Sequence, residues 1–347
     1  MAKQSRAGKI SKRKRGYKHI EIRNVPLRRF TLNIGSDQDL KDVLPYFVNR
    51  YVAEGCITAF LKTQYATNAC ISQHIMHWRV ENDVVSLKGI FRFLTDVQNC
   101  TSRFCVVRLT LYGDSDDAGL AHANIVIVDK LQGTVERYDP HHGAVDIMID
   151  AKLVFLDGLL SVIFDNLFKY KYFDPLSYCP HIEIGLQDYE KQSDVVTYNN
   201  GLCVLWTLIY TEFRLTFADM PRDRVVQELL NKFEELSKTK QIGAYLQHFA
   251  NRYQSLVLKA YPGQEEVFKS FYTMENDYRD GKVQPFSNLW YSLKSIFAGP
   301  HEQLSDIKYN ESTQNWEFRR WEGSTFSWDV IKSLQNEISL LTPDSFF

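Results

Sequence analysis

The chain has 347 residues, 44% of them hydrophobic, and a formal net charge of −1 at pH 7. This length can bury a sizeable core, either in one large domain with additions or in two domains. No run of about 18 apolar residues occurs, so we expect no transmembrane helix. The N-terminus is basic but has no apolar segment behind it, so we also expect no signal peptide.

The cysteines show neither a CxxC pair nor a regular framework. They are Cys56, Cys70, Cys100, Cys105, Cys179 and Cys203. In a chain of this length, that pattern predicts reduced thiols and an intracellular location in the cytoplasm or nucleus.

The near-zero charge hides an asymmetry, because residues 1–20 carry eight basic residues and no acidic one. The eight are Lys3, Arg6, Lys9, Lys12, Arg13, Lys14, Arg15 and Lys18. Such an arm is typical of a solvated, flexible tail. It is also typical of a nuclear import signal, or of a segment that contacts nucleic acid or another polyanion. We therefore expect residues 1–18 to be either a solubilising tail or a polyanion-binding arm.

The segment before residue 104 gives mixed signals. Residues 19–32 are consistent with an extended segment, and a capping box at 36–39 precedes an apolar run with helical spacing. Residues 57–97 are ambiguous, and we expect them to be helical in part. His74 and His77 would share one helix face, but without an obvious third ligand we do not expect a metal site there.

The clearest elements follow. Residues 104–112 predict a strand, and residues 113–119 a solvated loop rather than a calcium loop, because no glutamate follows at the required position. Residues 122–128 and 134–139 predict two strands joined by a turn at Gln132-Gly133, which makes them an antiparallel hairpin.

Later segments alternate between apolar helices and irregular stretches. We expect helices over 147–168 and 201–217, an extended segment over 170–178, and amphipathic helices over about 226–236 (after Pro221), 242–258 and 330–341. Short segments rich in tryptophan and phenylalanine follow residue 262, with Trp316, Phe318, Trp321, Phe326 and Trp328 expected to pack in a core or interface.

Together these elements predict an α+β fold: a short mixed or antiparallel sheet flanked by helices, with helical and aromatic-rich additions. The expected organisation is a basic arm over 1–20, an N-terminal helical and extended region over 21–103, a core over 104–260 and a C-terminal accessory region over 261–347.

Four residues suggest a thiol-based site. Cys203 follows the turn-like Asn199-Asn200-Gly201 and opens a helix, where the helix dipole favours a thiolate. His122 begins one strand of the hairpin and Asp139 ends the other, so the hairpin should bring an imidazole and its orienting carboxylate together. Gln187 lies upstream of the cysteine, where its amide could stabilise an oxyanion.

The order His122, Asp139, Gln187, Cys203 resembles that of the adenain-like cysteine peptidases, the group that includes ubiquitin-like-modifier proteases. The sequences His-x-Asn-Ile-Val-Ile-Val-Asp from 122, Glu-Arg-Tyr-Asp-Pro-His from 136 and Gly-x-Cys-x-x-Trp from 201 are similar to those of cysteine-peptidase-like proteins encoded by large DNA viruses. The likeness covers about residues 104–217.

The resemblance implies a papain-like or adenain-like core without cofactor or metal, and a role for each of the four residues. His122 would be the general base, Asp139 its orienter, Gln187 the oxyanion donor and Cys203 the nucleophile. The implied function is a thiol endopeptidase or ubiquitin-like-modifier deconjugase acting on protein substrates. For a viral protein, the substrates would include virion or capsid proteins and the location would extend to the virion.

The sequence departs from the family pattern at three places. Ala123 replaces the usual Trp, Leu202 and Val204 replace the usual Asp and Gly beside Cys203, and the gap from Gln187 to Cys203 is longer than usual, which makes Gln192 a second oxyanion candidate. Two alternatives therefore stay open: a catalytically inactive structural or virion component of the same fold, and an acyltransferase with the same site architecture.

Three histidines and a cysteine are further candidate metal ligands. His141, His142, Cys179 and His181 match no familiar ligand spacing, so we predict no metal there.

Overall fold

The computed structural model describes residues 68–112, 121–141, 152–178, 185–192, 203–243, 306–319 and 326–342, together with residues 245, 246, 249 and 252. All of them belong to one unit that spans residues 36–347, and residues 1–35 make up a second unit. The basic arm, the extended segment at 19–32, the helix after the capping box and the loop at 113–119 lie outside the described residues.

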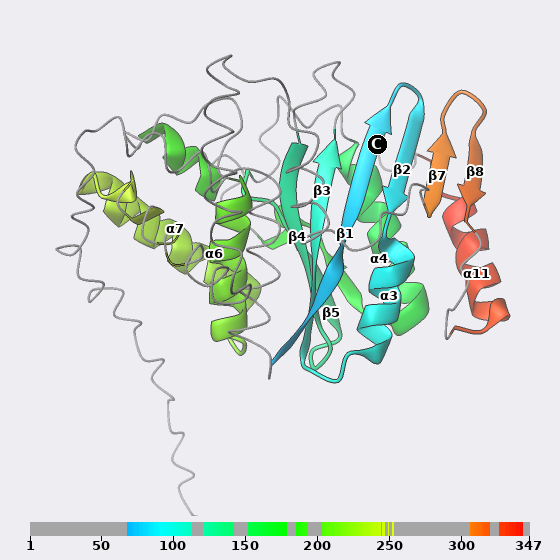
Figure 1. Ribbon diagram of the computed structural model, residues 1–347, viewed down its shortest axis with the longest axis horizontal. Helices are drawn as coiled ribbons and strands as arrows, with labels where there is room; N and C mark the ends of the chain where they lie inside the picture. The colour runs from blue at the N-terminus through cyan, green and yellow to red at the C-terminus, as the bar shows by residue number, and fades with distance from the viewer. Residues whose placement is uncertain are drawn as a thin grey trace, which may run out of the picture. The chain divides into compact units, whose positions relative to one another are not determined.

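An eight-stranded mixed sheet forms the centre of the described structure, with the order β6-β5-β4-β3-β1-β2-β7-β8 (Figure 1). The strands are β1 (Ala69–Glu81), β2 (Val84–Lys88), β3 (Phe104–Tyr112), β4 (Ala121–Asp129), β5 (Thr134–Tyr138), β6 (Lys171–Phe173), β7 (Ile307–Asn310) and β8 (Asn315–Phe318). β1 and β3 pair in parallel, as do β5 and β6, and the other neighbours are antiparallel.

Helices lie on both faces of this sheet. They are α3 (Ile90–Asn99), α4 (Leu153–Phe168), α5 (Pro175–Tyr178), the 3-10 helix η4 (Leu186–Gln192), α6 (Cys203–Thr216), α7 (Arg222–Lys238) and α11 (Trp328–Ser339). α3, α4 and α11 bury their apolar residues with those of the strands in one cluster. α6 packs on the opposite face of β4 and contacts α7 and η4. The predicted α+β class is thus confirmed.

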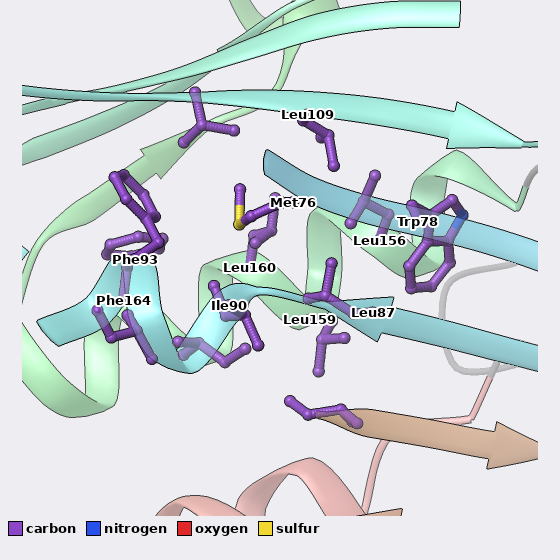
Figure 2. Close-up of a cluster of buried hydrophobic side chains, with 14 of the residues drawn as sticks. Met76, Trp78, Leu87, Ile90, Phe93, Leu109, Leu156, Leu159, Leu160 and Phe164 are labelled. Carbon is purple, nitrogen blue, oxygen red and sulfur yellow. The ribbon is translucent and has the colours of Figure 1, made fainter. Parts of the chain in front are cut away.

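A buried apolar core lies between the sheet and the helices α3 and α4 (Figure 2). Alternate residues of β1 face it, and Met76 and Trp78 are both fully buried there. The ring of Trp78 meets Phe155 of α4 edge-on at 6.0 Å, and Phe93 of α3 meets Phe164 at 6.1 Å. One apolar cluster therefore joins an early strand to a helix about 80 residues later in the chain.

A glycine sets the entry to α3. Gly89 has φ +84°, a backbone conformation that residues with a Cβ rarely adopt. A Cβ placed there would lie 2.7 Å from the carbonyl oxygen of Ile75. The chain can turn from β2 into α3 this close to β1 only because residue 89 has no side chain.

The described strands and helices from residue 104 onward agree with most predictions. The strands predicted over 104–112, 122–128 and 134–139 are β3, β4 and β5, and Gly133 makes the turn with φ +63°. α4, α6, α7 and α11 match four predicted helices, although the described part of the first begins at Leu153. Within the predicted helix over 242–258, the described residues are helical.

Two local predictions were wrong. Residues 69–88 form β1 and β2, so His74 and His77 lie on a strand and do not share a helix face. Their ring nitrogens instead approach Arg92 and Tyr112, at 3.4 and 3.3 Å. β1 is central and has a bulge, which obscures the two-residue period. The segment expected to be extended over 170–178 ends in the short helix α5.

One sheet combines strands from three of the segments expected from the sequence. β1 and β2, which precede residue 104, join the strands of the expected core because β1 pairs with β3. β7 and β8, from the C-terminal region, extend the sheet beyond β2. Trp316, Phe318 and Phe326 pack against the main apolar cluster, as expected for core aromatic residues, whereas Trp328 is exposed. Among the residues that the structure describes, no helix is both long and apolar enough to cross a membrane.

A disulfide joins Cys70 at the start of β1 to Cys100 after α3, with 5.9 Å between the Cα atoms. The expectation that all six thiols are reduced was therefore wrong for this pair. The two cysteines meet because α3 returns the chain to the beginning of β1, which their spacing in the sequence does not indicate. Cys105 and Cys203 are free and buried.

We expect reduction of this disulfide to lower the free energy of unfolding by about 3–4 kcal/mol, because it closes a loop of 30 residues. Urea denaturation with and without dithiothreitol measures the difference. A Cys70→Ser/Cys100→Ser variant should match the reduced protein and be insensitive to dithiothreitol. Equal stability of the oxidised and reduced wild-type protein would contradict this prediction.

Candidate active site

His122 and Asp139 meet at the open end of the β4–β5 hairpin, as the sequence predicted. His122 is the second residue of β4, and Asp139 directly follows the last residue of β5. The Nε2 atom of His122 lies 2.7 Å from Oδ1 of Asp139. Both side chains are buried, so this charge-assisted hydrogen bond is shielded from water.

The Asp139 carboxylate has two further neighbours. The backbone N–H of His141 donates to Oδ1 at 2.8 Å, and Nη1 of Arg137 lies 3.5 Å from Oδ2. Burial alone would raise the pKa of Asp139, but the charge and hydrogen bond of His122 and the charge of Arg137 hold it well below its usual range. The carboxylate is therefore ionised at neutral pH.

The imidazole of His122 bonds to this carboxylate and is also influenced by the thiol of Cys203. Burial lowers the pKa of His122, but the charge and hydrogen bond of Asp139, followed by the hydrogen bond and charge of Cys203, raise it to about 10. Asp139 occupies Nε2, which leaves Nδ1 as the nitrogen available to the sulfur. A cysteine beside a histidine that an acid orients is the arrangement of a nucleophile with its base.

Cys203 is the first residue of α6, as predicted. The other free cysteine of the described residues has a different environment: Cys105 lies in the core, where burial raises the pKa of its thiol to about 12. Of these two thiols, that of Cys203 is the one that interacts with an imidazole.

The face of α6 that carries Cys203 is fixed to β5 by two further side chains at helical spacing, Tyr210 and Arg214. The ring of Tyr210 stacks on Tyr138, with 3.8 Å between centroids and 8° between planes. Nε of Arg214 donates to Glu136 at 3.0 Å. These contacts fix the rotation of α6 above the hairpin, and hence where its first residue lies.

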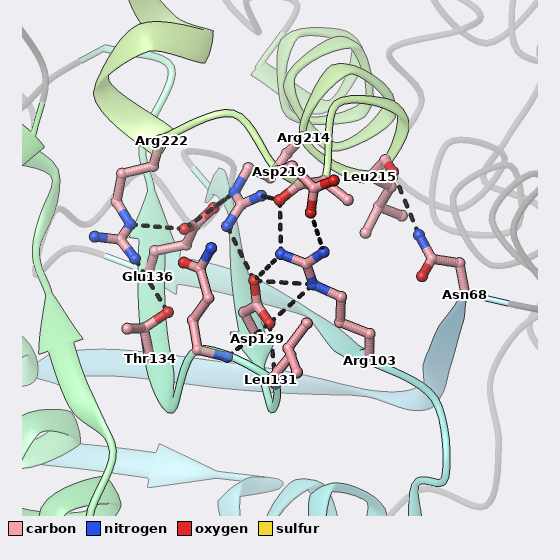
Figure 3. Close-up of polar contacts among 12 residues, drawn as sticks. Asn68, Arg103, Asp129, Leu131, Thr134, Glu136, Arg214, Leu215, Asp219 and Arg222 are labelled. Atoms are coloured by element: carbon pink, nitrogen blue, oxygen red, sulfur yellow. Dashed lines mark hydrogen bonds and ion pairs between the residues drawn. The ribbon is translucent and has the colours of Figure 1, made fainter. Parts of the chain in front are cut away.

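Buried ion pairs extend this attachment to neighbouring elements (Figure 3). Glu136 also accepts a hydrogen bond from Arg222 of α7 at 2.9 Å. Asp129, at the end of β4, pairs with Arg103 at 2.9 Å and lies 3.6 Å from Arg214. The hairpin thus presents two carboxylates to three arginines, and neither carboxylate is left without a cation.

Gln187 lies in η4, beside the segment that follows Asp139. Its N–H donates to the carbonyl oxygen of Pro140 at 3.0 Å, and its Oε1 is buried with no hydrogen-bond partner among the described residues. A Cβ at Gly185 would collide with that same carbonyl and lie 2.8 Å from Cα of His141. The glycine therefore allows η4 to approach the site closely.

The role of Gln187 stays a prediction, as does that of its alternative. η4 contacts α6, the helix that begins at Cys203. Gln192 is the last residue of η4, and its side chain lies outside the described residues. Trp206 of α6 is fully buried, and its ring meets that of Phe233 of α7 at 4.7 Å.

Sequence reasoning missed several residues around the pair. Arg137 and Asn124 are polar residues two positions from Asp139 and His122, so strand alternation could have placed them on the same face. The ring of His141 lies 5.0 Å from that of His122. His142, Cys179 and His181 lie outside the described residues. Within the part of the chain that is described, no cluster of three or more histidine, cysteine or acidic side chains could hold a metal.

No protein-family model matches this chain. A stretch of 123 residues is 28% identical to a protein of Acanthamoeba polyphaga mimivirus whose description is a putative ankyrin repeat protein. The match covers 32% of this chain and 16% of the viral protein. This chain therefore corresponds to only a small part of that relative.

We expect Asp139→Asn to lower the pKa of His122 from about 10 by more than one unit, because burial remains while the negative charge is removed. Titration of the imidazole resonances by NMR measures this change. Asp219→Asn is the matched control, since Asp219 is exposed and pairs with Arg103. An unchanged pKa in Asp139→Asn would contradict the assignment.

The His122–Asp139 pair should also make the free energy of unfolding depend on pH. The folded-state pKa of His122 is raised, so the stabilisation from the pair is fully present below the unfolded pKa of about 6.5 and is lost as the pH rises through about 10. The difference in free energy of unfolding between wild type and Asp139→Asn should therefore shrink over this pH range.

Proposed function

We propose that this protein is a cysteine peptidase, either a thiol endopeptidase or a deconjugase of ubiquitin-like modifiers. The observation that carries the proposal is the buried His122, bonded through Nε2 to Asp139 at 2.7 Å and in contact with the thiol that opens α6. A nucleophile, a base and an orienting acid are the minimum set for this chemistry.

In the proposed reaction, the Cys203 thiolate attacks the scissile carbonyl carbon. The carbonyl oxygen becomes an oxyanion, which the side-chain amide of Gln187 stabilises. When the C–N bond breaks, the His122 imidazolium gives its proton to the leaving amine, and a thioester remains on Cys203. Water, deprotonated by His122, then attacks the thioester, which releases the carboxylic acid and the thiol.

A labelling experiment tests the proposal. Cys203 should react with a thiol-reactive acyl probe about 100-fold or more faster than Cys105, because His122 can act as its base and burial raises the pKa of the Cys105 thiol to about 12. His122→Ala should abolish the excess, and peptide mass spectrometry after short exposures measures both rates. Similar rates at the two cysteines, or an excess that persists in His122→Ala, would contradict the proposal.

The main rival is an inactive structural or virion component with the same fold, which the departures at Ala123 and Val204 favour. It predicts no excess reactivity at Cys203. An acyltransferase would show the excess but would also move an acetyl group from acetyl-coenzyme A to a lysine or serine acceptor. Incubation with acetyl-coenzyme A separates this activity from peptide hydrolysis.

The substrates that we propose are virion or capsid proteins, with the basic arm holding the enzyme on packaged DNA or within the particle. The partial likeness to a mimivirus protein and the eight basic residues of the arm support this setting. The intracellular location, in the cytoplasm or nucleus of a host, belongs to the same proposal.

We expect the arm to bind duplex DNA with an affinity that falls as salt rises, with a log–log slope of about −0.9 for each phosphate contacted. Fluorescence anisotropy from low to physiological salt measures the slope. A full-length variant with the eight basic residues of the arm changed to glutamine controls for length and should bind weakly. Association that is insensitive to salt and independent of the arm would count against this role.

A further inference from the structure

Arg137 is a buried arginine on the same side of the sheet as the candidate acid and base. It pairs across the hairpin with Val126, which lies in the core between the sheet and α4. Strand alternation puts Asn124 and His122 on that side of β4, and Asp139 on that side just beyond β5. The Arg137 side chain is only 3% exposed, so its charge is poorly screened by water.

Two neighbours fix the orientation of the guanidinium group. Nε and Nη2 donate to the two carboxylate oxygens of Asp157 on α4, each at 2.7 Å. Asp157 also accepts a hydrogen bond from Tyr172 of β6 at 2.6 Å. Nη1 donates to Oδ1 of Asn124. Because a bidentate pair fixes the plane of the guanidinium, the remaining nitrogen has a defined direction.

That nitrogen is directed toward Asp139. Nη1 lies 3.5 Å from Oδ2 of Asp139, and Oδ2 is buried without a hydrogen-bond partner in the described structure. Oδ1 already accepts from His122 and from the backbone of His141. A buried carboxylate oxygen without a hydrogen bond is costly unless a positive charge lies nearby, and Arg137 supplies this charge.

We propose that Arg137 is a positioning residue of the site, held in place by Asp157 and Asn124. Its charge keeps Asp139 ionised and leaves Oδ1 of Asp139 available to His122. This inference rests on the proposed peptidase function only for its catalytic consequence. The electrostatic part concerns Asp139 itself and can be measured in a protein without known substrate. Arg137 touches neither the thiol nor the reacting atoms, so it acts through Asp139.

A purely structural role is the alternative, in which the Arg137–Asp157 pair only fastens α4 to β5. The matched control for this alternative is Arg222, an arginine with a 12% exposed side chain that pairs with Glu136 on the opposite face of β5. Loss of either arginine removes a cation from a buried carboxylate, Asp139 just beyond β5 or Glu136 within it. Only the loss of Arg137 should raise the pKa of Asp139.

The experiment compares Arg137→Gln with Arg222→Gln in the full chain. Arg137→Gln should raise the pKa of Asp139 by one unit or more, a tenfold or greater gain in proton affinity, as followed by the ¹³C carboxyl resonance. Arg137→Lys should restore much of the wild-type pKa of Asp139. Arg222→Gln should leave the pKa of Asp139 unchanged.

A second variant covers the case in which Arg137→Gln does not fold. Arg137→Met/Asp157→Leu replaces the ion pair with apolar side chains of similar size, a change that proteins often tolerate. The pKa of Asp139 should rise in this variant as well. If it stays at the wild-type value in a folded variant without Arg137, or if Arg222→Gln raises it equally, the inference is overturned.

The two proposals fail in distinguishable ways. A raised pKa of Asp139 in a protein whose wild-type Cys203 shows no excess labelling would uphold the electrostatic role of Arg137 and remove the peptidase function. Excess labelling at Cys203 with an Asp139 indifferent to Arg137 would do the opposite.

Discussion

The attachment of α6 to the β4–β5 hairpin is the constraint on which the candidate site depends. The hairpin by itself can join His122 to Asp139, because both residues belong to it. The thiol comes from a helix that begins more than 60 residues later, and its position follows from the stacking of Tyr210 on Tyr138 and the bond from Arg214 to Glu136. Any rotation of α6 about its axis would carry Cys203 away from the imidazole.

Strand β5 contributes side chains both to the attachment of α6 and to the surroundings of Asp139. Glu136 and Tyr138 face α6, whereas Arg137 faces α4 and lies beside Asp139. The two sets alternate along the strand because successive side chains point to opposite faces of a sheet. A register shift of one residue would exchange the two sets, so the pairing of β4 with β5 fixes both the nucleophile helix and the acid.

Burying this many charges is costly, and removal of either partner of such a pair leaves an uncompensated ion. Every described carboxylate of the hairpin therefore has a cation close by: Asp129 has Arg103, Glu136 has Arg214 and Arg222, and Asp139 has His122 and Arg137. Such charges specify which elements meet. Their value for the site lies in fixing distances, which catalysis by a positioned base requires.

Local patterns in the sequence determined the β4–β5 hairpin, the helix α6 and the fold class. The alternation over 122–139 with a glycine turn predicted the hairpin, and a hairpin makes neighbours of its open ends, so the His122–Asp139 contact followed from chain geometry. The apolar run after residue 201 predicted α6 and the place of Cys203 at its start. The α+β class followed from the mixture of these periods.

Only the tertiary structure decided the rest, because long-range contacts leave no local period in the sequence. β1 is a central strand with a bulge, so polar and apolar residues do not alternate regularly along it. The Cys70–Cys100 disulfide forms because α3 returns the chain to the start of β1. β7 and β8 join an edge of the sheet more than 200 residues after β2. The position of Arg137 between Asp157 and Asp139 likewise needed α4 to be placed against β5, since a charged residue in a strand becomes informative only when its partners are known.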